Sequence, residues 1–387
     1  MNSSALAIED GTLYPSPDAP PVRHATVIVR DGRIVKAGPA VSIPSDVKVI
    51  SGEGGSILAG FWNSHVHFTE PKWNLAATDP ADRLNFHLRD MLTSRGFTSV
   101  VDTGSNPVVT LGLRARLESN ELIGPSILTA GPSVFPPNGI PYYLRDDLSP
   151  ELLPFVPQPS TPNEAVEFVR RNLSAGADLV KLFTGSYVTR GQIVTMPESV
   201  ARAAVVAAHA AGKLVYSHPS NLEGTRIAIR SGVDVLAHPP DATEGVDAAL
   251  IGEMVARGMS MTPTLKMFAD TVSTDSDYIG PITDLVRSFA ERGGDLLFGT
   301  DVGYMTDYTT EAEFLWLQRA GLNASRILRM LTTAPAIRFG VEGSLGTVTP
   351  GARADIVLVA GDPIEDLRSF ARVLASFRAG RTLFQRY

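Results

Sequence analysis

The chain has no cysteine among its 387 residues. Disulfide bonds, thiolate zinc sites and cysteine nucleophiles are therefore excluded, and a bound metal would have to be held mainly by histidine and carboxylate side chains. No stretch approaches the roughly 18 consecutive apolar residues that a membrane helix needs. No run of Lys or Arg stands out, and the net charge is −7. Nucleic acid and membranes are therefore not expected partners.

The composition is globular, with 44% hydrophobic and 19% charged residues. Such a length suits one large domain together with a smaller one. The first residues show neither the basic segment nor the apolar segment of a secretory leader. We therefore expect a soluble, cytoplasmic protein.

Both ends of the chain consist of short strand-like segments separated by turns. Ala25–Arg30 and Arg33–Ala37 flank an Asp-Gly hairpin signal, and the C-terminal stretch has the same texture. We expect residues 1–58 and 341–387 to form one small β-sandwich domain built from both chain termini.

The middle of the chain alternates between apolar runs and helix-like segments. The eight apolar runs are Ser56–Gly60, Thr98–Val101, Ser126–Ala130, Asp178–Leu182, Lys213–Tyr216, Val233–Ala237, Met259–Met261 and Leu296–Phe298. The helix-like segments are Pro80–Ser94, Asn163–Ala175, Pro197–Ala211, Leu222–Ser231 and Asp247–Arg257. Eight strands that alternate with helices predict an α/β fold, a (β/α)₈ TIM barrel over residues 59–340. The segment Pro132–Pro162, with nine prolines, interrupts this rhythm and predicts a long ordered loop over the barrel mouth.

Two histidines stand two residues apart in the segment F-W-N-S-H-V-H-F. Residues i and i+2 of a strand share a face, so the imidazoles of His65 and His67 can reach one metal ion. His218 and His238 end the fifth and sixth predicted strands, and Asp301 ends the eighth. Strand ends of a barrel meet at one mouth, and a carboxylate there can be both ligand and proton acceptor.

Lys181 ends the fourth predicted strand in L-V-K-L-F. A protonated lysine cannot bind a metal, and its ordinary role is a buried ion pair. A neutral amine that reacts with carbon dioxide becomes a carbamate, whose two oxygens can bridge two cations. Burial and nearby cations lower a lysine pKa and make that neutral amine accessible.

These motifs, together with G-S-L-G-T-V-T-P-G-A-R-A-D-I-V-L-V near the C-terminus, resemble the amidohydrolase superfamily over nearly the whole chain. The lysine at the end of the fourth strand resembles the one found in the superfamily branch that has a binuclear metal centre, in which this lysine is carbamylated. The spacing of the motifs looks most like Xaa-Pro and Xaa-Arg dipeptidases and imidazolonepropionase-like proteins, near which some mycotoxin-cleaving amidases also fall. Because many relatives assemble, a homo-oligomer is expected.

The resemblance implies the role of each site residue. His65, His67 and Asp301 would hold one divalent metal. His218 and His238 would hold a second one, and carbamylated Lys181 would bind both metals. Zinc suits such imidazole and carboxylate ligands best, although manganese, cobalt or iron could also bind. A hydroxide between the metals would attack an amide carbonyl of a small-molecule substrate such as an N-acyl amino acid or a dipeptide, and Asp301 would carry the proton to the leaving nitrogen.

Specificity is expected to come from the loops over the mouth. The candidate substrate-binding residues are Tyr142, Tyr143, Arg145, Tyr187 and Tyr304, with Arg190 and Lys266 as further possibilities. The chain departs from the dipeptidase pattern in two places. The segment after strand three has no histidine, and T-G-S-Y follows V-K-L-F where a Gly-Gly turn is usual.

Three alternatives stay open at this stage. The first is a hydrolase of cyclic amides or lactams. The second is a mononuclear deaminase, for which Glu223, five residues after His218, could be the catalytic acid. The third is a non-catalytic scaffold protein, which the filled set of ligand positions disfavours.

Overall fold

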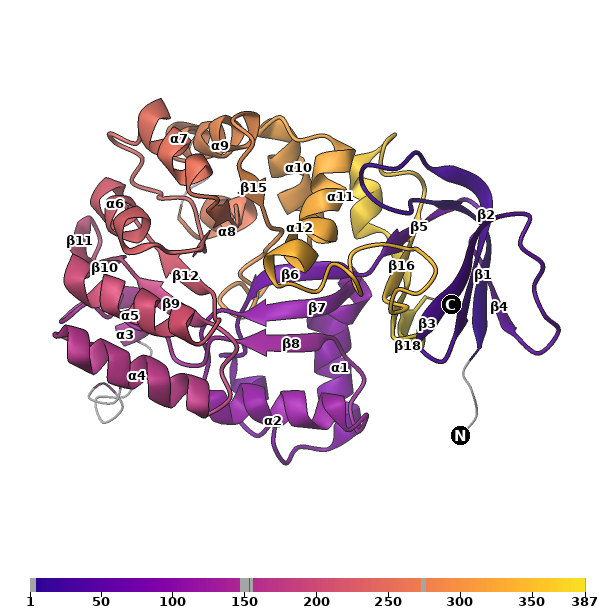
Figure 1. The fold of residues 1–387 in the computed structure, drawn as a ribbon, viewed down its shortest axis with the longest axis horizontal. Helices are drawn as coiled ribbons and strands as arrows, with labels where there is room; N and C mark the ends of the chain where they lie inside the picture. The colour runs from indigo at the N-terminus through magenta and orange to yellow at the C-terminus, as the bar shows by residue number, and fades with distance from the viewer. Residues whose placement is uncertain (1–4, 147–152, 154–155, 273–275, 387) are drawn as a thin grey trace.

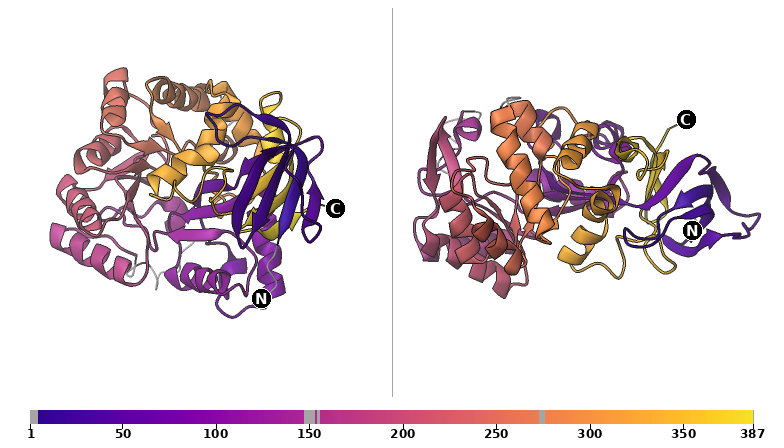
Figure 2. Two further views of the ribbon diagram at one scale, coloured as in Figure 1. Left: turned by 45° about the vertical axis from the view of Figure 1, so that its right-hand side comes forward. Right: turned by 90° about the horizontal axis from the view of Figure 1, so that it is seen from above.

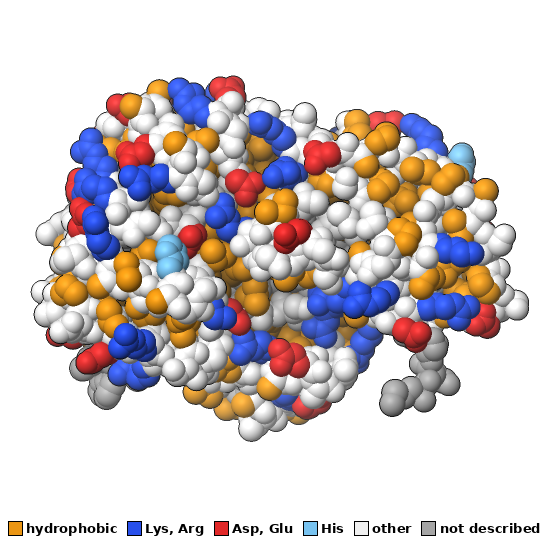
Figure 3. All heavy atoms as spheres, viewed as in Figure 1, with side chains coloured by type: hydrophobic (Ala, Val, Ile, Leu, Met, Phe, Trp, Pro, Cys, Tyr) orange, Lys and Arg blue, Asp and Glu red, His pale blue; other side chains and the backbone are white. Residues whose placement is uncertain are grey.

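The computed structural model describes residues 5–146, 153, 156–272 and 276–386. The fold is α/β and contains two parallel sheets surrounded by helices, with a further sheet built from both chain termini at the other end of the molecule (Figures 1 and 2). Acidic and basic side chains are interspersed over the face drawn in Figure 3. Within the described part of the chain, no helix has the length and apolar character to cross a membrane.

The terminal sheet joins the two ends of the chain. Its order is β18-β17-β16-β5-β1-β2-β3, and β4 pairs with β1. Its strands are β1 (Leu6–Leu13), β2 (Val22–Arg30), β3 (Arg33–Pro39), β4 (Lys48–Ser51), β5 (Gly55–Ala59), β16 (Ile356–Ala360), β17 (Val373–Arg378) and β18 (Arg381–Gln385). The junction is the antiparallel pair β5–β16, in which Ile57 lies opposite Leu358 and both are buried. The two termini thus share one sheet; its arrangement as a sandwich stays a prediction.

Eight further strands form two parallel sheets of three and five strands, ordered β6-β7-β8 and β15-β14-β13-β12-β9. They are β6 (Phe61–Val66), β7 (Phe97–Asp102), β8 (Ser126–Thr129), β9 (Val180–Phe183), β12 (Val215–His218), β13 (Val235–Leu236), β14 (Ser260–Met261) and β15 (Asp295–Leu296). Backbone hydrogen bonds also link the two sheets. The amide of Asp178 donates to Thr129 O at 2.8 Å, and the amide of Ser64 donates to Phe298 O at 2.7 Å. The sheets are therefore joined both between β8 and β9 and between β6 and the segment after β15.

The first strand of the parallel region differs from the prediction. We expected it at Ser56–Gly60, but that stretch is β5 of the terminal sheet, and the parallel strand is β6. The break falls at Gly60, where a Cβ would lie 2.2 Å from Thr98 Oγ1. His65 consequently lies within β6 rather than beyond a turn that follows the strand.

All five predicted helices are present. The twelve α-helices that the described residues form are α1 (Ala81–Met91), α2 (Pro107–Glu118), α3 (Tyr142–Arg145), α4 (Pro162–Ser174), α5 (Glu198–Ala210), α6 (Leu222–Ser231), α7 (Ala248–Ala256), α8 (Leu265–Thr271), α9 (Ser276–Glu291), α10 (Glu311–Arg319), α11 (Ala324–Leu331) and α12 (Thr333–Arg338). Local signals fix their ends. For example, the Asn221 side chain accepts from Gly224 N at the start of α6, and Gly232, with φ 86°, ends it.

The proline-rich segment is partly ordered by packing. Phe135 and Ile140 form a small buried cluster with Phe183, and the rings of Phe135 and Phe183 lie 4.6 Å apart. The short helix α3 belongs to this segment, and a two-stranded sheet of β10 (Gly185–Thr189) and β11 (Gln192–Thr195) follows β9. Residues 147–152 and 154–155 of the predicted loop lie outside the described residues.

Candidate metal centre

His65 and His67 point their Nε2 atoms toward the same place. Nδ1 of His65 lies 2.9 Å from Ala237 O, and Nδ1 of His67 lies 2.7 Å from Gly104 O. A carbonyl only accepts hydrogen bonds, so each ring donates through Nδ1. The two Nε2 atoms are 3.3 Å apart. Burial lowers the pKa of His65 to about 4, which leaves a lone pair on its Nε2.

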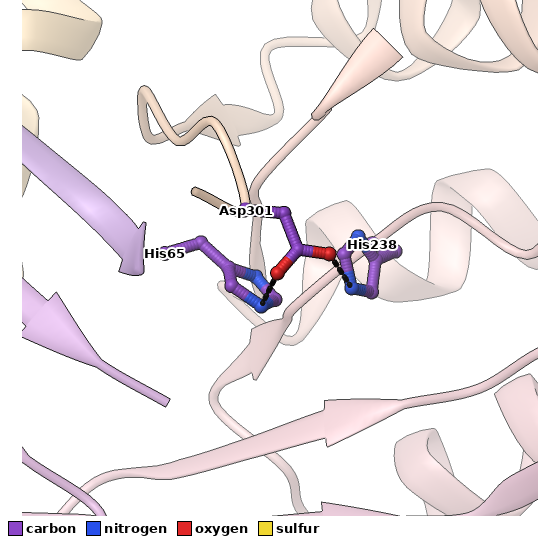
Figure 4. A group of neighbouring side chains, drawn as sticks. All are labelled: His65, His238 and Asp301. Atoms are coloured by element: carbon purple, nitrogen blue, oxygen red, sulfur yellow. Dashed lines mark ion pairs between the residues drawn. The ribbon is translucent and has the colours of Figure 1, made fainter. Parts of the chain in front are cut away.

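Asp301 lies between imidazoles from two strands (Figure 4). Its Oδ1 atom is 3.3 Å from His65 Nε2 and 3.0 Å from His67 Nε2, and its Oδ2 is 3.6 Å from His238 Nε2. Burial would raise its pKa, but the adjacent His65 and His67 hold the pKa of Asp301 well below its ordinary value. The group is therefore an ionised carboxylate.

The backbone around Asp301 is constrained. Asp301 adopts a left-handed φ of 59°, and its amide donates to His65 O at 2.9 Å. Two residues later, Gly303 has φ 102°, and a Cβ there would lie 1.9 Å from His67 O. Only glycine allows this approach, so the G-T-D-V-G segment presses Asp301 against β6.

His218 and His238 complete the imidazole group from β12 and from the residues just after β13. Their ring centroids are 4.8 Å apart, and the His65 and His238 centroids are 4.4 Å apart. Burial lowers the pKa of His218 to about 3 and places that of His238 well below its usual value. Both rings are therefore neutral and can act as ligands.

Lys181 is buried on β9, with 1% of its surface exposed. Its Nζ lies 5.2 Å from the centroid of the Phe183 ring, and that ring stacks on the His218 ring with a centroid distance of 4.7 Å. Burial lowers the pKa of Lys181 to about 8, although Asp301 and Asp102 oppose the shift. Lys181 therefore loses its proton more readily near neutral pH than an exposed lysine does, and β9 pairs with β12, the strand that carries His218.

These residues fit a bound metal. The ligand atoms of His65, His238 and Asp301 all lie within 4.8 Å of one another, and Asp301 Oδ1 is buried without a hydrogen bond from the described residues. Lone pairs that converge at such distances need positive charge between them. A proton can supply it, since Asp301 raises the pKa of His67 against the effect of burial, and so can a metal cation.

Supporting residues that the sequence did not reveal hold these ligands. Thr264 Oγ1 lies 2.7 Å from His238 Nδ1, and Thr264 directly precedes α8. The buried Glu313 carboxylate accepts the amides of Leu265 and Lys266 at 3.1 and 2.6 Å. Near His67, Asp102 at the end of β7 accepts from Gly104 N at 3.2 Å, which fixes the loop that carries the carbonyl partner of His67. Such outer contacts orient metal ligands.

Of the four predicted tyrosines, three pack against one another and the fourth donates a hydrogen bond to a carboxylate. The Tyr143 ring lies 5.4 Å from Tyr142 and 5.7 Å from Tyr304. Tyr187 donates to Asp241, and so does Tyr278, a residue that sequence reasoning missed because it lies in a helix. We call Tyr142, Tyr143, Tyr187, Tyr278 and Tyr304 the tyrosine group.

The cationic candidates are placed differently. Arg145 is exposed and pairs with Asp146 at 3.4 Å, and Arg190 is exposed in the turn between β10 and β11. Lys266 is buried but pairs with Asp270 and Asp307 at 3.0 and 3.1 Å. Glu223, the acid that a deaminase would need, lies in the first turn of α6, where it pairs with Arg230 at 2.9 Å.

Comparisons with known proteins agree with this architecture. The amidohydrolase family profile matches residues 56–383. A Xaa-Pro dipeptidase with bound methionine has a similar structure, with a TM-score of 0.83 and 23% identity over 99% of this chain and 100% of that one. Molinate hydrolase has a similar structure with a TM-score of 0.78 and 19% sequence identity, over 99% of this chain and 95% of that one. A. niger ochratoxinase is similar with a TM-score of 0.79 and 18% sequence identity, over 100% of this chain and 97% of that one. No curated protein matched.

The fold and the family match together define a hydrolase that acts on carbon–nitrogen bonds, as the sequence predicted. The chain belongs to the amidohydrolase family.

Proposed function

We propose that this chain is a metal-dependent hydrolase that cleaves an amide bond of a small molecule, such as an N-acyl amino acid or a dipeptide-like compound. One observation carries the proposal. The ionised Asp301 carboxylate lies 3.3 and 3.0 Å from the imidazoles of His65 and His67, and its partners His65 and His238 are buried and neutral. Lys181 is buried on β9, the strand that pairs with β12 and its His218. The names of the similar structures, a dipeptidase, molinate hydrolase and ochratoxinase, fit this chemistry.

We further propose that the two parallel sheets form one closed (β/α)₈ barrel over residues 59–340, with residues 1–58 and 341–387 as the terminal β-sandwich domain. The hydrogen bonds from Asp178 to Thr129 and from Ser64 to Phe298 support closure because they bridge the two edges between the sheets. A barrel of this kind has its active site at the carboxyl ends of its strands, where the histidines lie.

Two divalent cations, zinc by the nature of the ligands, would occupy the centre. His65, His67 and Asp301 would hold one, and His218 and His238 the other. A carbamate on Lys181 would serve both. The burial of Lys181 and its lowered pKa support carbamylation because only the neutral amine reacts with carbon dioxide.

When bound, such cations polarise a substrate carbonyl and make an attacking water more acidic. The residues of the chain supply the other steps. Asp301, kept ionised by its neighbours, accepts the proton of the water and delivers it to the leaving nitrogen. Burial raises the pKa of Tyr143 well above 10. Its hydroxyl thus keeps its proton and is available to donate a hydrogen bond to the negatively charged oxygen that develops during attack.

A mononuclear deaminase is the second candidate. The cluster of His65, His238 and Asp301 would suit a single ion. The exposed position and the ion pair of Glu223 weigh against it, since that acid would have to face the metal.

The test is hydrolysis of a panel of N-acyl amino acids, dipeptides, lactams and aminopurines by zinc-loaded protein, with chelator-treated protein as control. We expect carboxylic acid and amine products only with the loaded protein. Release of ammonia from aminopurines alone would overturn the proposal in favour of deamination. Inertness toward the whole panel would contradict both.

A further inference from the structure

Asp241 joins three segments of the chain next to the metal centre. It follows His238 by three residues, at the carboxyl end of β13. The hydroxyls of Tyr187 on β10 and Tyr278 on α9 both donate to its Oδ2 atom, at 3.1 and 3.2 Å. Asp241 is half-buried, and burial raises the pKa of its carboxyl group to about 6, so most of it is ionised above neutral pH.

The tyrosine group connects Asp241 to Asp301. The pKa of Tyr143 is raised first by burial and further by the charges of Tyr304, Asp301 and Asp241. Both carboxylates therefore act on one hydroxyl. The ring of Tyr143 also packs against Tyr304, which follows Asp301 by three residues. Asp241 follows His238 by three residues, just as Tyr304 follows Asp301, so both lie in loops that begin at the metal centre.

Two carboxylates, Asp241 and Glu244, act on the hydroxyl of Tyr187. Two cationic side chains that the sequence offered for this region are engaged elsewhere, Arg145 with Asp146 and Lys266 with Asp270 and Asp307. This environment favours a positively charged ligand over a carboxylate.

A carboxylate flanked by tyrosine hydroxyls can recognise an ammonium group, since its charge attracts the cation and the phenol oxygens can accept hydrogen bonds from it. We infer that Asp241 is a specificity residue that binds a cationic group of the substrate, so that the preferred substrates are amides bearing an ammonium group. This inference rests on the proposed function, because it assigns the substrate class of the same site.

Asp241 could instead have only a structural role, in which its two hydrogen bonds hold β10, α9 and the segment after β13 together. We call these two hydrogen bonds the latch. Asp241→Asn separates the two roles. The amide oxygen still accepts both tyrosine hydroxyls, which preserves the latch, whereas the negative charge is lost. Tyr278→Phe is the matched control because it removes one hydrogen bond of the latch and leaves the charge.

The experiment compares ω-aminoacyl 4-nitroanilides of increasing chain length with acyl 4-nitroanilides in which a methyl group replaces the ammonium. We expect that, for at least one chain length, the zinc-loaded wild type cleaves the ammonium substrate with a kcat/KM about 10- to 100-fold higher than that of its methyl counterpart. This is the ratio that a hydrogen bond to a charged group produces. Asp241→Asn should lose that preference, and Tyr278→Phe should keep it. An equal rate for both members in the wild type, or an unchanged preference in Asp241→Asn, would overturn the inference.

Equilibrium binding separates this inference from the proposed function. Tetramethylammonium cannot ligate a metal, and tert-butanol is its neutral counterpart of similar size. Calorimetry should show that the wild type binds the cation more tightly than the alcohol and that Asp241→Asn does not discriminate. If no anilide is hydrolysed but this discrimination is found, the proposed function fails and the cation site stands. If anilides are hydrolysed without discrimination in either measurement, the cation site fails and the hydrolase stands.

Discussion

Thr264 Oγ1 lies 2.7 Å from Nδ1 of His238, and Thr264 makes this contact from a left-handed conformation with φ 45° and ψ 41°. Such a conformation costs a β-branched residue about 1–3 kcal/mol and persists only where surrounding contacts enforce it. Glu313 supplies those contacts by accepting the next two backbone amides. The strained residue is thus fixed where it can orient His238.

Thr264→Val should weaken metal binding. Valine keeps the shape of threonine but cannot accept the Nδ1 proton of His238, and loss of such an outer contact costs about 10- to 100-fold in metal affinity. Thr264→Ser keeps the hydroxyl and is the matched control. Zinc affinity measured by competition with a chelator checks this. Equal affinities for the valine variant and the wild type would show that the contact does not support the ligand.

Lys181→Ala should nearly abolish turnover and reduce the amount of bound metal, because the residue would serve both ions. Lys213→Ala is the control, since Lys213 lies before the amino end of β12, away from the histidines. Activity assays and elemental analysis of both variants provide the measurement. A Lys181→Ala protein with wild-type turnover would contradict the assigned role.

Asp301→Asn should lower kcat by about 10²- to 10⁴-fold, the usual contribution of a positioned proton acceptor. The amide keeps the size of the side chain but cannot take up a proton, so part of the bound metal should be retained. Steady-state kinetics at several pH values, with metal content measured on the same samples, would check this. A variant with unchanged kcat would rule out Asp301 as the proton shuttle.

The buried Glu313 predicts a pH dependence of stability. Burial raises its pKa from the ordinary 4.5 to about 7. Between these values the unfolded chain loses its proton while the folded chain retains it, so the free energy of unfolding falls as pH rises from 4.5 to 7. Relative to Glu313→Gln, the wild type should lose about 3 kcal/mol over this window. Denaturant unfolding of both proteins at pH 5 and pH 8 measures the difference, and parallel pH profiles would contradict the shift.

The sequence predicted that His65, His67, His238 and Asp301 lie together, because these residues lie at or just beyond the ends of parallel strands. The i, i+2 spacing of His65 and His67 and the strand ends at His218 and Asp301 place these groups together whatever the loop conformations are. The fold class and the shared terminal sheet were likewise predictable from strand and helix periodicity. The first parallel strand was misplaced because β5 and β6 are adjacent apolar runs, and the close contact of Gly60 with Thr98 that separates them is tertiary.

The supporting residues could not be predicted in the same way. Thr264 and Glu313 are 49 positions apart, and neither belongs to a recognisable motif, so only packing shows that they act together. Tyr278 reads as an ordinary residue of a helix until Asp241 is found beside it. The ion pair of Arg145 with the neighbouring Asp146 likewise became visible only in the structure, and substrate binding by Arg145 stays a prediction.

The central claim is a two-metal centre bridged by a modified Lys181. The most direct measurement combines the metal content per chain with an anomalous-scattering crystal structure of the zinc-loaded protein. We predict two metal ions per chain and density for a carbamate that joins Nζ of Lys181 to both. One metal ion per chain, with an unmodified Lys181, would contradict the account.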